Sequence, residues 1–135
     1  VISDQYGVPT NADWLAKASL DLVLDQHLKL KPFPSGIYHA VPQGETNWYE
    51  LACLAVDTAF HAGVQLQLSS GDIQAIPAIE YPLPAPRPMN SRMSTDKLYK
   101  ALEITGDMSK LQHLTKPWAE EVKAYVHHLA KAGLI

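Results

Sequence analysis

A proline-rich segment in the middle of the chain limits what this sequence can fold into. Between Ile73 and Pro88 stand five prolines: Pro77, Pro82, Pro84, Pro86 and Pro88. Each proline removes a backbone donor and clashes with the preceding helical turn, so this stretch cannot form a continuous helix. Its other residues, among them Tyr81 and Leu83, are too apolar for a solvated linker. We therefore expect residues 73–94 to be an extended, polyproline-like segment on the surface of one domain, residues 1–135.

Composition narrows the class of protein without naming a function. A length of 135 residues suits a single domain, and a net charge of −3 argues against a nucleic-acid partner, which would usually meet a basic excess. No apolar run could span a bilayer, and the first residues lack the pattern of a signal peptide. We expect a soluble cytoplasmic protein with no membrane partner. The single cysteine, Cys53, excludes an internal disulfide framework.

On both sides of the proline-rich segment, helical and strand patterns alternate, which indicates an α/β architecture. Apolar spacing predicts a helix over 11–28 with Thr10 as its N-cap, and the short apolar run 36–41 predicts a buried strand. Thr46 is predicted to cap a second helix, with Trp48 on its apolar face and Gly63 just past its end. A short helix is expected from Thr95 through Leu102, and the last helix is expected to start near Pro117.

The beginning of the chain resembles the end of a buried strand, Val1-Ile2, rather than the start of a domain. Too few strands follow to complete a sheet. We therefore expect a piece of a longer protein, although a processed terminus or a removed tag would give the same start.

Several catalytic and cofactor patterns are absent from the sequence. The glycines form no GxGxxG fingerprint or P-loop, no tyrosine has a lysine four residues on, and neither HExxH nor GxSxG occurs. The six histidines are scattered, except for His127 and His128. Neighbours on a helix point about 100° apart, so these two cannot hold one ion together. We expect no metal site.

Two segments are candidates for ligand binding. Arg87, Asn90 and Arg92 place two guanidiniums and an amide on a proline-restricted backbone, and an arginine fork suits phosphate oxygens. Alternatively, both arginines pair with surface carboxylates or carbonyl groups. The loop from Gln5 to Asp13, which includes Thr10, ends at a helix N-terminus that can bind an anion. Its alternative is an ordinary capped helix start.

Four sequence blocks occur in an order that is similar to a known family. They are Asp-Gln-Tyr-Gly-Val-Pro-Thr (4–10), Gly-Ile-Tyr-His (36–39), Gly-Glu-Thr-Asn-Trp-Tyr (44–49) and Tyr-Pro-Leu-Pro-Ala-Pro-Arg-Pro-Met-Asn-Ser-Arg (81–92). Together they resemble the C-terminal part of the dTDP-4-dehydrorhamnose reductases, within the extended short-chain dehydrogenase/reductase superfamily. The resemblance covers roughly residues 1–100 and resumes at Pro117-Trp118.

The resemblance implies a fold, an activity and partners. The chain would be the C-terminal substrate-binding lobe and last sheet elements of an NAD(P)-binding Rossmann-type reductase, without its N-terminal Rossmann part. The parent enzyme would reduce the 4-keto group of dTDP-6-deoxy-L-lyxo-4-hexulose with NADPH or NADH, giving dTDP-L-rhamnose. The dinucleotide-binding glycines and the catalytic tyrosine and lysine would lie upstream, so this chain would carry no catalytic residue and bind no cofactor by itself.

The same resemblance assigns partners and site residues. The partners would be the dTDP-sugar, the N-terminal Rossmann domain and, in some settings, a second copy in a homodimer. Gln5 and Thr10 would line the cleft between lobes, with Arg87, Asn90 and Arg92 on the sugar-nucleotide side.

Three departures from the family pattern leave the substrate open. One arginine, Arg87, precedes the proline where the family usually has two, which weakens a role in binding diphosphate. The stretch 103–116 is longer than the usual link, and Met93 replaces the usual leucine. A non-catalytic regulatory or binding module of the same superfamily is the alternative function.

We predict that the 135-residue chain alone neither oxidises NADPH nor reduces a keto-sugar, because it lacks the acid, the base and the glycine-rich loop that this chemistry needs. The measurement is NADPH absorbance with the repurified chain and the keto-sugar. Turnover that persists through repeated purification would contradict the prediction.

Overall fold

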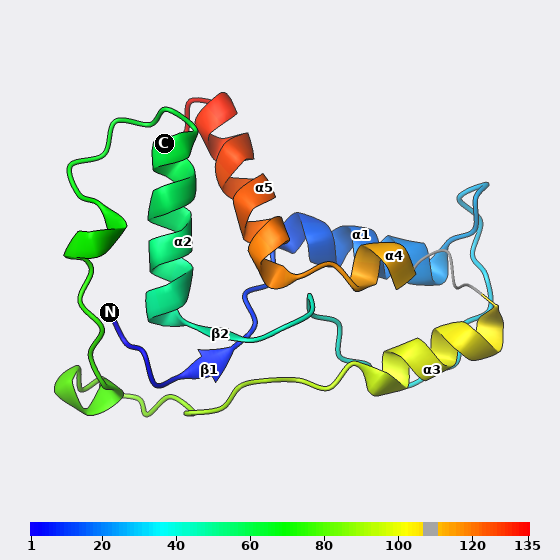
Figure 1. Ribbon diagram of the computed structural model, residues 1–135. Helices are drawn as coiled ribbons and strands as arrows, with labels where there is room; N and C mark the ends of the chain where they lie inside the picture. Colours follow the sequence, from blue (N-terminus) through cyan, green and yellow to red (C-terminus); the bar gives the residue numbers. More distant parts are fainter. Residues whose placement is uncertain (107–110) are drawn as a thin grey trace.

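The structure, a computed structural model, describes residues 1–106 and 111–135, so part of the long 103–116 stretch lies outside the described residues. Its helices form two groups joined by extended segments (Figure 1). In one group α2 (Trp48–His61) packs beside α5 (Trp118–Lys131). Two short antiparallel strands, β1 (Tyr6–Gly7) and β2 (Thr46–Asn47), lie between the groups. None of the helices in the described residues combines the length and apolarity that crossing a bilayer needs.

The α2 helix starts where it was expected but is capped differently. The side-chain oxygen of Asn47 accepts the backbone N–H of Glu50 at 2.9 Å, so Asn47 is the N-cap. The prediction of Thr46 is therefore wrong by one residue: its hydroxyl donates instead to the Glu50 carboxylate at 2.8 Å. At the other end Gly63 adopts a φ of +86°, which favours glycine and confirms its predicted place after the helix.

The second group contains α1 (Ala12–Val23), α3 (Asp96–Thr105) and α4 (Leu111–Leu114). Asn11, not the predicted Thr10, caps α1 by accepting the backbone N–H of Asp13 at 2.7 Å. The helix ends at Val23, five residues before the predicted position 28. The reason is Asp25, whose carboxylate accepts the backbone N–H groups of His27 and Lys29 at 2.8 and 2.9 Å and so holds a turn in place of another helical turn.

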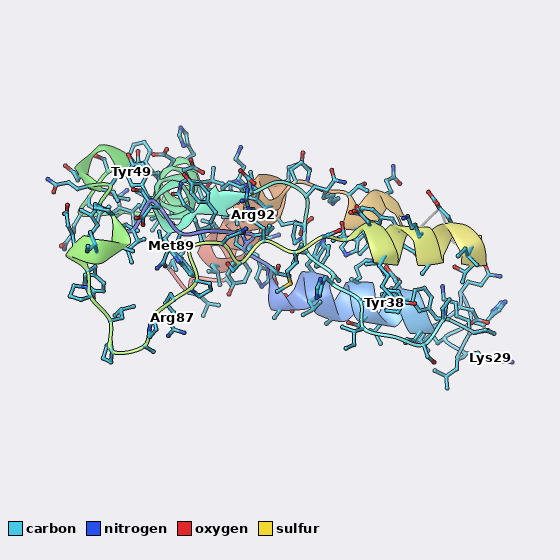
Figure 2. All side chains as sticks on the ribbon, turned by 90° about the horizontal axis from the view of Figure 1, so that it is seen from below. Lys29, Tyr38, Tyr49, Arg87, Met89 and Arg92 are labelled. Atoms are coloured by element: carbon cyan, nitrogen blue, oxygen red, sulfur yellow. The ribbon has the colours of Figure 1, made fainter. Side chains whose placement is uncertain are left out.

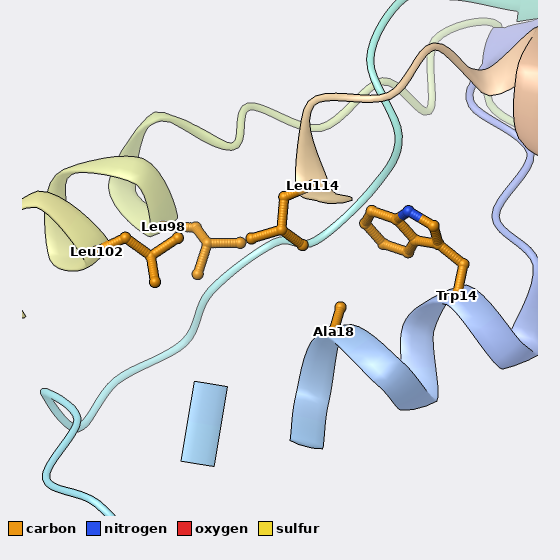
Figure 3. Close-up of a cluster of buried hydrophobic side chains, with 5 residues drawn as sticks. All are labelled: Trp14, Ala18, Leu98, Leu102 and Leu114. Atoms are coloured by element: carbon orange, nitrogen blue, oxygen red, sulfur yellow. The ribbon is translucent and has the colours of Figure 1, made fainter. Parts of the chain in front are cut away.

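A small hydrophobic core holds this second group together (Figure 3). It is made of one side of α1, one side of α3 and the end of α4, and its buried residues are Trp14, Ala18, Leu98, Leu102 and Leu114. The α3 helix begins after Thr95, as predicted, and extends past Leu102 to Thr105. The last helix, α5, likewise starts directly behind Pro117, as predicted.

The strand predicted over 36–41 is wrong. These residues form neither a strand nor a helix, and Ile37 is 81% exposed. A strand needs a neighbour for its backbone N–H and C=O groups, and within the described ranges none pairs with this run. Val1-Ile2 is not a buried strand either, because Ile2 forms only an isolated parallel bridge with Ile76 and Val1 is exposed.

The proline-rich segment lies on the surface, with residues 81–94 exposed throughout. It is not extended along its whole length, because one turn of 3-10 helix, η2 (Ala78–Glu80), follows Pro77. A second such turn, η1 (Ser70–Asp72), precedes it beside α2. A single turn fits between prolines because Pro77 stands just before the turn and Pro82 stands beyond it, so neither disrupts its hydrogen bonds.

Replacing Leu98 with alanine should lower the free energy of unfolding by about 2 to 5 kcal/mol, because it leaves a cavity in the core. Leu30→Ala is the matched control, since Leu30 is 84% exposed. Urea unfolding followed by circular dichroism measures both. Equal losses in the two variants would contradict this description of the core.

Candidate functional site

Three segments that are far apart in the sequence meet at β1. On one side Tyr6 and Gly7 pair with Asn47 and Thr46. On the other side Tyr6 forms a parallel bridge with Asn90: its N–H donates to the Met89 carbonyl at 2.9 Å, and its carbonyl accepts the Ser91 N–H at 2.8 Å. Three of the four sequence blocks that carry the family resemblance are therefore assembled side by side.

Gly7 allows this close approach. A Cβ atom at position 7 would lie 2.6 Å from the hydroxyl oxygen of Ser91, which is nearer than carbon and oxygen can stand without a shift. The same hydroxyl donates to the Tyr6 carbonyl at 3.1 Å. Glycine at this position thus permits the proline-rich segment to run directly against β1.

A cavity of about 940 Å³ opens next to these three segments. Aromatic side chains of Tyr6, Trp48 and Tyr81 line it, together with aliphatic residues from the first helical turn of α2 and from the proline-rich segment. Gln5 and Arg87 add an amide and a cation to the lining. Largely apolar walls with few polar groups are typical of small-molecule sites, and this volume lies within the usual range for such sites.

The five residues predicted from the sequence divide into three sets. Gln5 and Arg87 line the large cavity. Asn90 and Arg92 bind each other, because the Arg92 Nε–H donates to the Asn90 side-chain oxygen at 2.9 Å. Thr10 lines neither the large cavity nor the smaller one, and its hydroxyl donates to the Val8 carbonyl at 3.4 Å.

The two arginines consequently occupy different surroundings. Figure 2 shows Arg87 close to the outer bend of the proline-rich segment and Arg92 nearer the middle of the molecule. Arg92 lies beside a second cavity of about 350 Å³ and pairs with Glu45, with 2.5 Å between its Nη1 and the carboxylate oxygen. The alternative in which an arginine pairs with a surface carboxylate therefore holds for Arg92.

Sequence reasoning missed two aromatic residues of the cavity. Trp48 was predicted on the buried face of α2, but it is 57% exposed and lines the cavity. It is the first residue of α2, and Leu51, one turn further along the helix, lines the same cavity. Tyr81 lies among the prolines, and an aromatic residue in an exposed, proline-restricted segment was the signal that could have marked it.

Two titratable groups outside the cavity have shifted pKa values. A hydrogen bond with Cys53, the charge of Cys53 when ionised and partial burial raise the pKa of Tyr49. Hydrogen bonds from the Ser69 backbone and hydroxyl lower the pKa of Asp72. A carboxyl group whose pKa is lower in the folded than in the unfolded chain stabilises the fold when the pH is above the unfolded pKa. This stabilisation is lost as the pH falls through the folded pKa.

The described residues offer no cluster of three or more His, Cys, Asp or Glu side chains that could hold a metal ion. Besides aliphatic residues, the lining of the large cavity includes aromatic rings, two amides, two hydroxyl side chains and one guanidinium. Such a lining suits a ligand with flat and anionic parts, because apolar rings can bury the former and an arginine fork can pair with the latter.

Comparison with protein families gives one match over nearly the whole chain. Residues 1–131 match the model of the RmlD substrate binding domain.

Comparison with curated proteins finds relatives that are much longer than this chain. A dTDP-4-dehydrorhamnose reductase from Salmonella typhimurium is 39% identical over 104 residues, which cover 77% of this chain and 33% of the relative. The reductase of the same name from Escherichia coli K12 is 41% identical over 97 residues, which cover 72% of this chain and 31% of the relative. SpsK, a spore coat polysaccharide biosynthesis protein from Bacillus subtilis, is 30% identical over 132 residues, which cover 98% of this chain and 38% of SpsK. The chain spans about a third of the length of these relatives.

A solved structure supports the same relationship. The crystal structure of a dTDP-4-dehydrorhamnose reductase from Clostridium acetobutylicum superposes with a TM-score of 0.61 and is 25% identical in sequence. The alignment covers 96% of this chain and 38% of that one.

Gly7→Ala should destabilise the fold by about 1 kcal/mol, because its Cβ would displace the Ser91 hydroxyl from its hydrogen bond to the Tyr6 carbonyl. In a chain that already carries Ser91→Ala, Gly7→Ala should cost much less, because the colliding oxygen and its hydrogen bond are already gone. Gly71→Ala is the control, since a Cβ there meets Ser69 at an ordinary 3.6 Å. If Gly7→Ala lowers the thermal midpoint as much in the Ser91→Ala background as in the unaltered chain, the close contact is not the cause.

Proposed function

The chain belongs to the RmlD substrate-binding domain family, and from this membership we propose that it binds the sugar nucleotide of a dTDP-4-dehydrorhamnose reductase. The observation that carries the proposal is the large cavity at β1. Most of its lining comes from three of the sequence blocks that resemble the reductases, and Arg87 supplies a guanidinium. A dTDP-sugar has a flat base and an anionic diphosphate, which suit aromatic walls and a guanidinium, respectively.

In a protein as long as the relatives, the proposed reaction is reduction of the 4-keto group of dTDP-6-deoxy-L-lyxo-4-hexulose to dTDP-L-rhamnose. NADPH or NADH would supply the hydride, and residues outside this chain would supply the catalytic tyrosine and lysine. The role of this chain is to bind and orient the sugar nucleotide. Arg87 and Gln5 are the residues that we propose to contact it.

The residues of this chain do not fit a nicotinamide dinucleotide. Binding its pyrophosphate calls for glycines at the turn into a helix N-terminus. Here Gly63 and Gly106 follow the C-terminal ends of α2 and α3. Gly44 precedes the N-terminus of α2 but packs against the Trp118 ring, and it is a single glycine rather than a glycine-rich turn. We therefore propose that the cofactor is bound by a Rossmann-type part outside residues 1–135, and we assign no step of hydride transfer to this chain.

The run 36–41 is the proposed contribution to the sheet of that Rossmann-type part. Its sequence is typical of a buried strand, yet Ile37 is exposed and the run is unpaired in the described residues. The Ile37 carbonyl accepts a hydrogen bond from the Lys97 ammonium at 2.9 Å, but no strand pairs with the run in the described residues. Such an apolar run gains both backbone hydrogen bonds and burial by adding to the edge of a sheet. This explains why a strand pattern occurs where the chain alone forms no strand.

We predict that the chain binds dTDP and that Arg87→Ala weakens this binding by about tenfold or more, because a hydrogen bond to a charged group contributes about 1.5 to 3 kcal/mol. Isothermal titration calorimetry with dTDP measures both proteins. The control is Lys123→Ala, which removes an exposed cation on α5, away from the cavity lining. If Arg87→Ala binds dTDP as tightly as the unaltered chain, Arg87 is not a ligand.

A further inference from the structure

We infer that Arg92 is a positioning residue, which clamps the proline-rich segment across β1 and thereby keeps Arg87 at the large cavity. The inference rests on the proposed function, because it concerns how the proposed ligand-binding arginine is held. It assigns different roles to two arginines that stand only five positions apart in the sequence.

The contacts of Arg92 join the two segments that flank β1. Its Nη1 contacts the carboxylate of Glu45, the residue directly before β2. Its Nε–H donates to the side-chain oxygen of Asn90, which bridges Tyr6 on the opposite side of β1. The side chain of Arg92 therefore spans from one neighbour of β1 to the other.

Asn90 orients the Arg92 side chain toward Glu45. Its side-chain oxygen accepts the backbone N–H of Arg92 at 3.1 Å as well as the Nε–H at 2.9 Å. The backbone bond holds the Asn90 side chain in place, and the Nε–H bond then restricts the guanidinium, so less conformational freedom is lost when the ion pair forms. This matters because both charged side chains are about half exposed, at 46% and 53%, and an isolated exposed pair contributes little.

The clamp acts where the segment has few other attachments. Residues 81–94 are exposed, and beside β1 the described backbone hydrogen bonds that hold them are those from Tyr6 to Met89 and from Ser91 to Tyr6. Arg92 follows these bonds directly in the sequence, and Arg87 precedes them. Without the clamp, the hydrogen bonds between Tyr6 and residues 89–91 should open more often. Arg87 should then move out of the cavity, with little effect on the cores of the helix groups.

The test measures local opening, global stability and ligand affinity in Arg92→Gln. Amide hydrogen exchange of Tyr6 and Ser91, followed by NMR, should speed up by about two- to fivefold. The amide of Val126 in α5 and the thermal midpoint should stay unchanged. Affinity for dTDP should fall by a similar factor, while Arg87→Ala should weaken dTDP binding without changing exchange at either amide.

Glu45→Gln supplies an independent arm, since it removes the other half of the ion pair. It should reproduce part of the faster exchange, and the double variant should exchange no faster than Arg92→Gln alone, because Arg92→Gln already breaks the ion pair as well as the bond to Asn90. Unchanged exchange in either single variant overturns the clamp. Weaker dTDP binding in Arg92→Gln with unchanged exchange overturns it too, because Arg92 would then contact the ligand itself. If the unaltered chain fails to bind dTDP, the proposed function fails, and the exchange data alone decide whether the clamp exists.

Discussion

Backbone hydrogen bonding on both sides of Tyr6 is the interaction on which the rest of the site depends. A strand of two residues has little stability of its own, but here it pairs with β2 on one side and with residues 89–91 on the other. This pairing brings the start of α2 and the proline-rich segment to the same place. Aromatic residues from all three segments then line one cavity.

The hydrophobic packing of the helices lies apart from this site. The core of α1, α3 and α4 contains none of the residues that line the large cavity, and α2 packs mainly against α5. Substitutions in the cores should therefore change the free energy of unfolding, whereas truncation of a cavity side chain such as Arg87 should change binding. The prolines of the proline-rich segment matter for both properties. Their fixed φ angles reduce the conformational entropy that is lost when this exposed stretch is held against β1.

The helices were more predictable than the strands for a physical reason. Apolar spacing placed α2, α3 and α5 close to their observed positions, because helix hydrogen bonds are local. The caps at Thr10 and Thr46 were each wrong by one residue, since the adjacent Asn11 and Asn47 compete for the same role and accept the N–H groups instead. The run 36–41 failed as a strand because its pairing depends on a partner that no local pattern reveals. Likewise, the sequence placed Arg87 and Arg92 in one candidate set. Their different surroundings are visible only in the fold, where Arg92 pairs with Glu45 and Arg87 lines the large cavity.

The most direct test of the account is NMR mapping of dTDP on the isotopically labelled chain. Binding at the site predicts that the amide shifts of residues 5–8, 47–48, 87 and 89–91 change together and saturate with one dissociation constant. Amides of the core around Trp14 and Leu98 should not move. Shifts confined to the smaller cavity near Thr95 and Asp96, or no saturable shifts at all, would contradict the claim that the three segments at β1 form a sugar-nucleotide site.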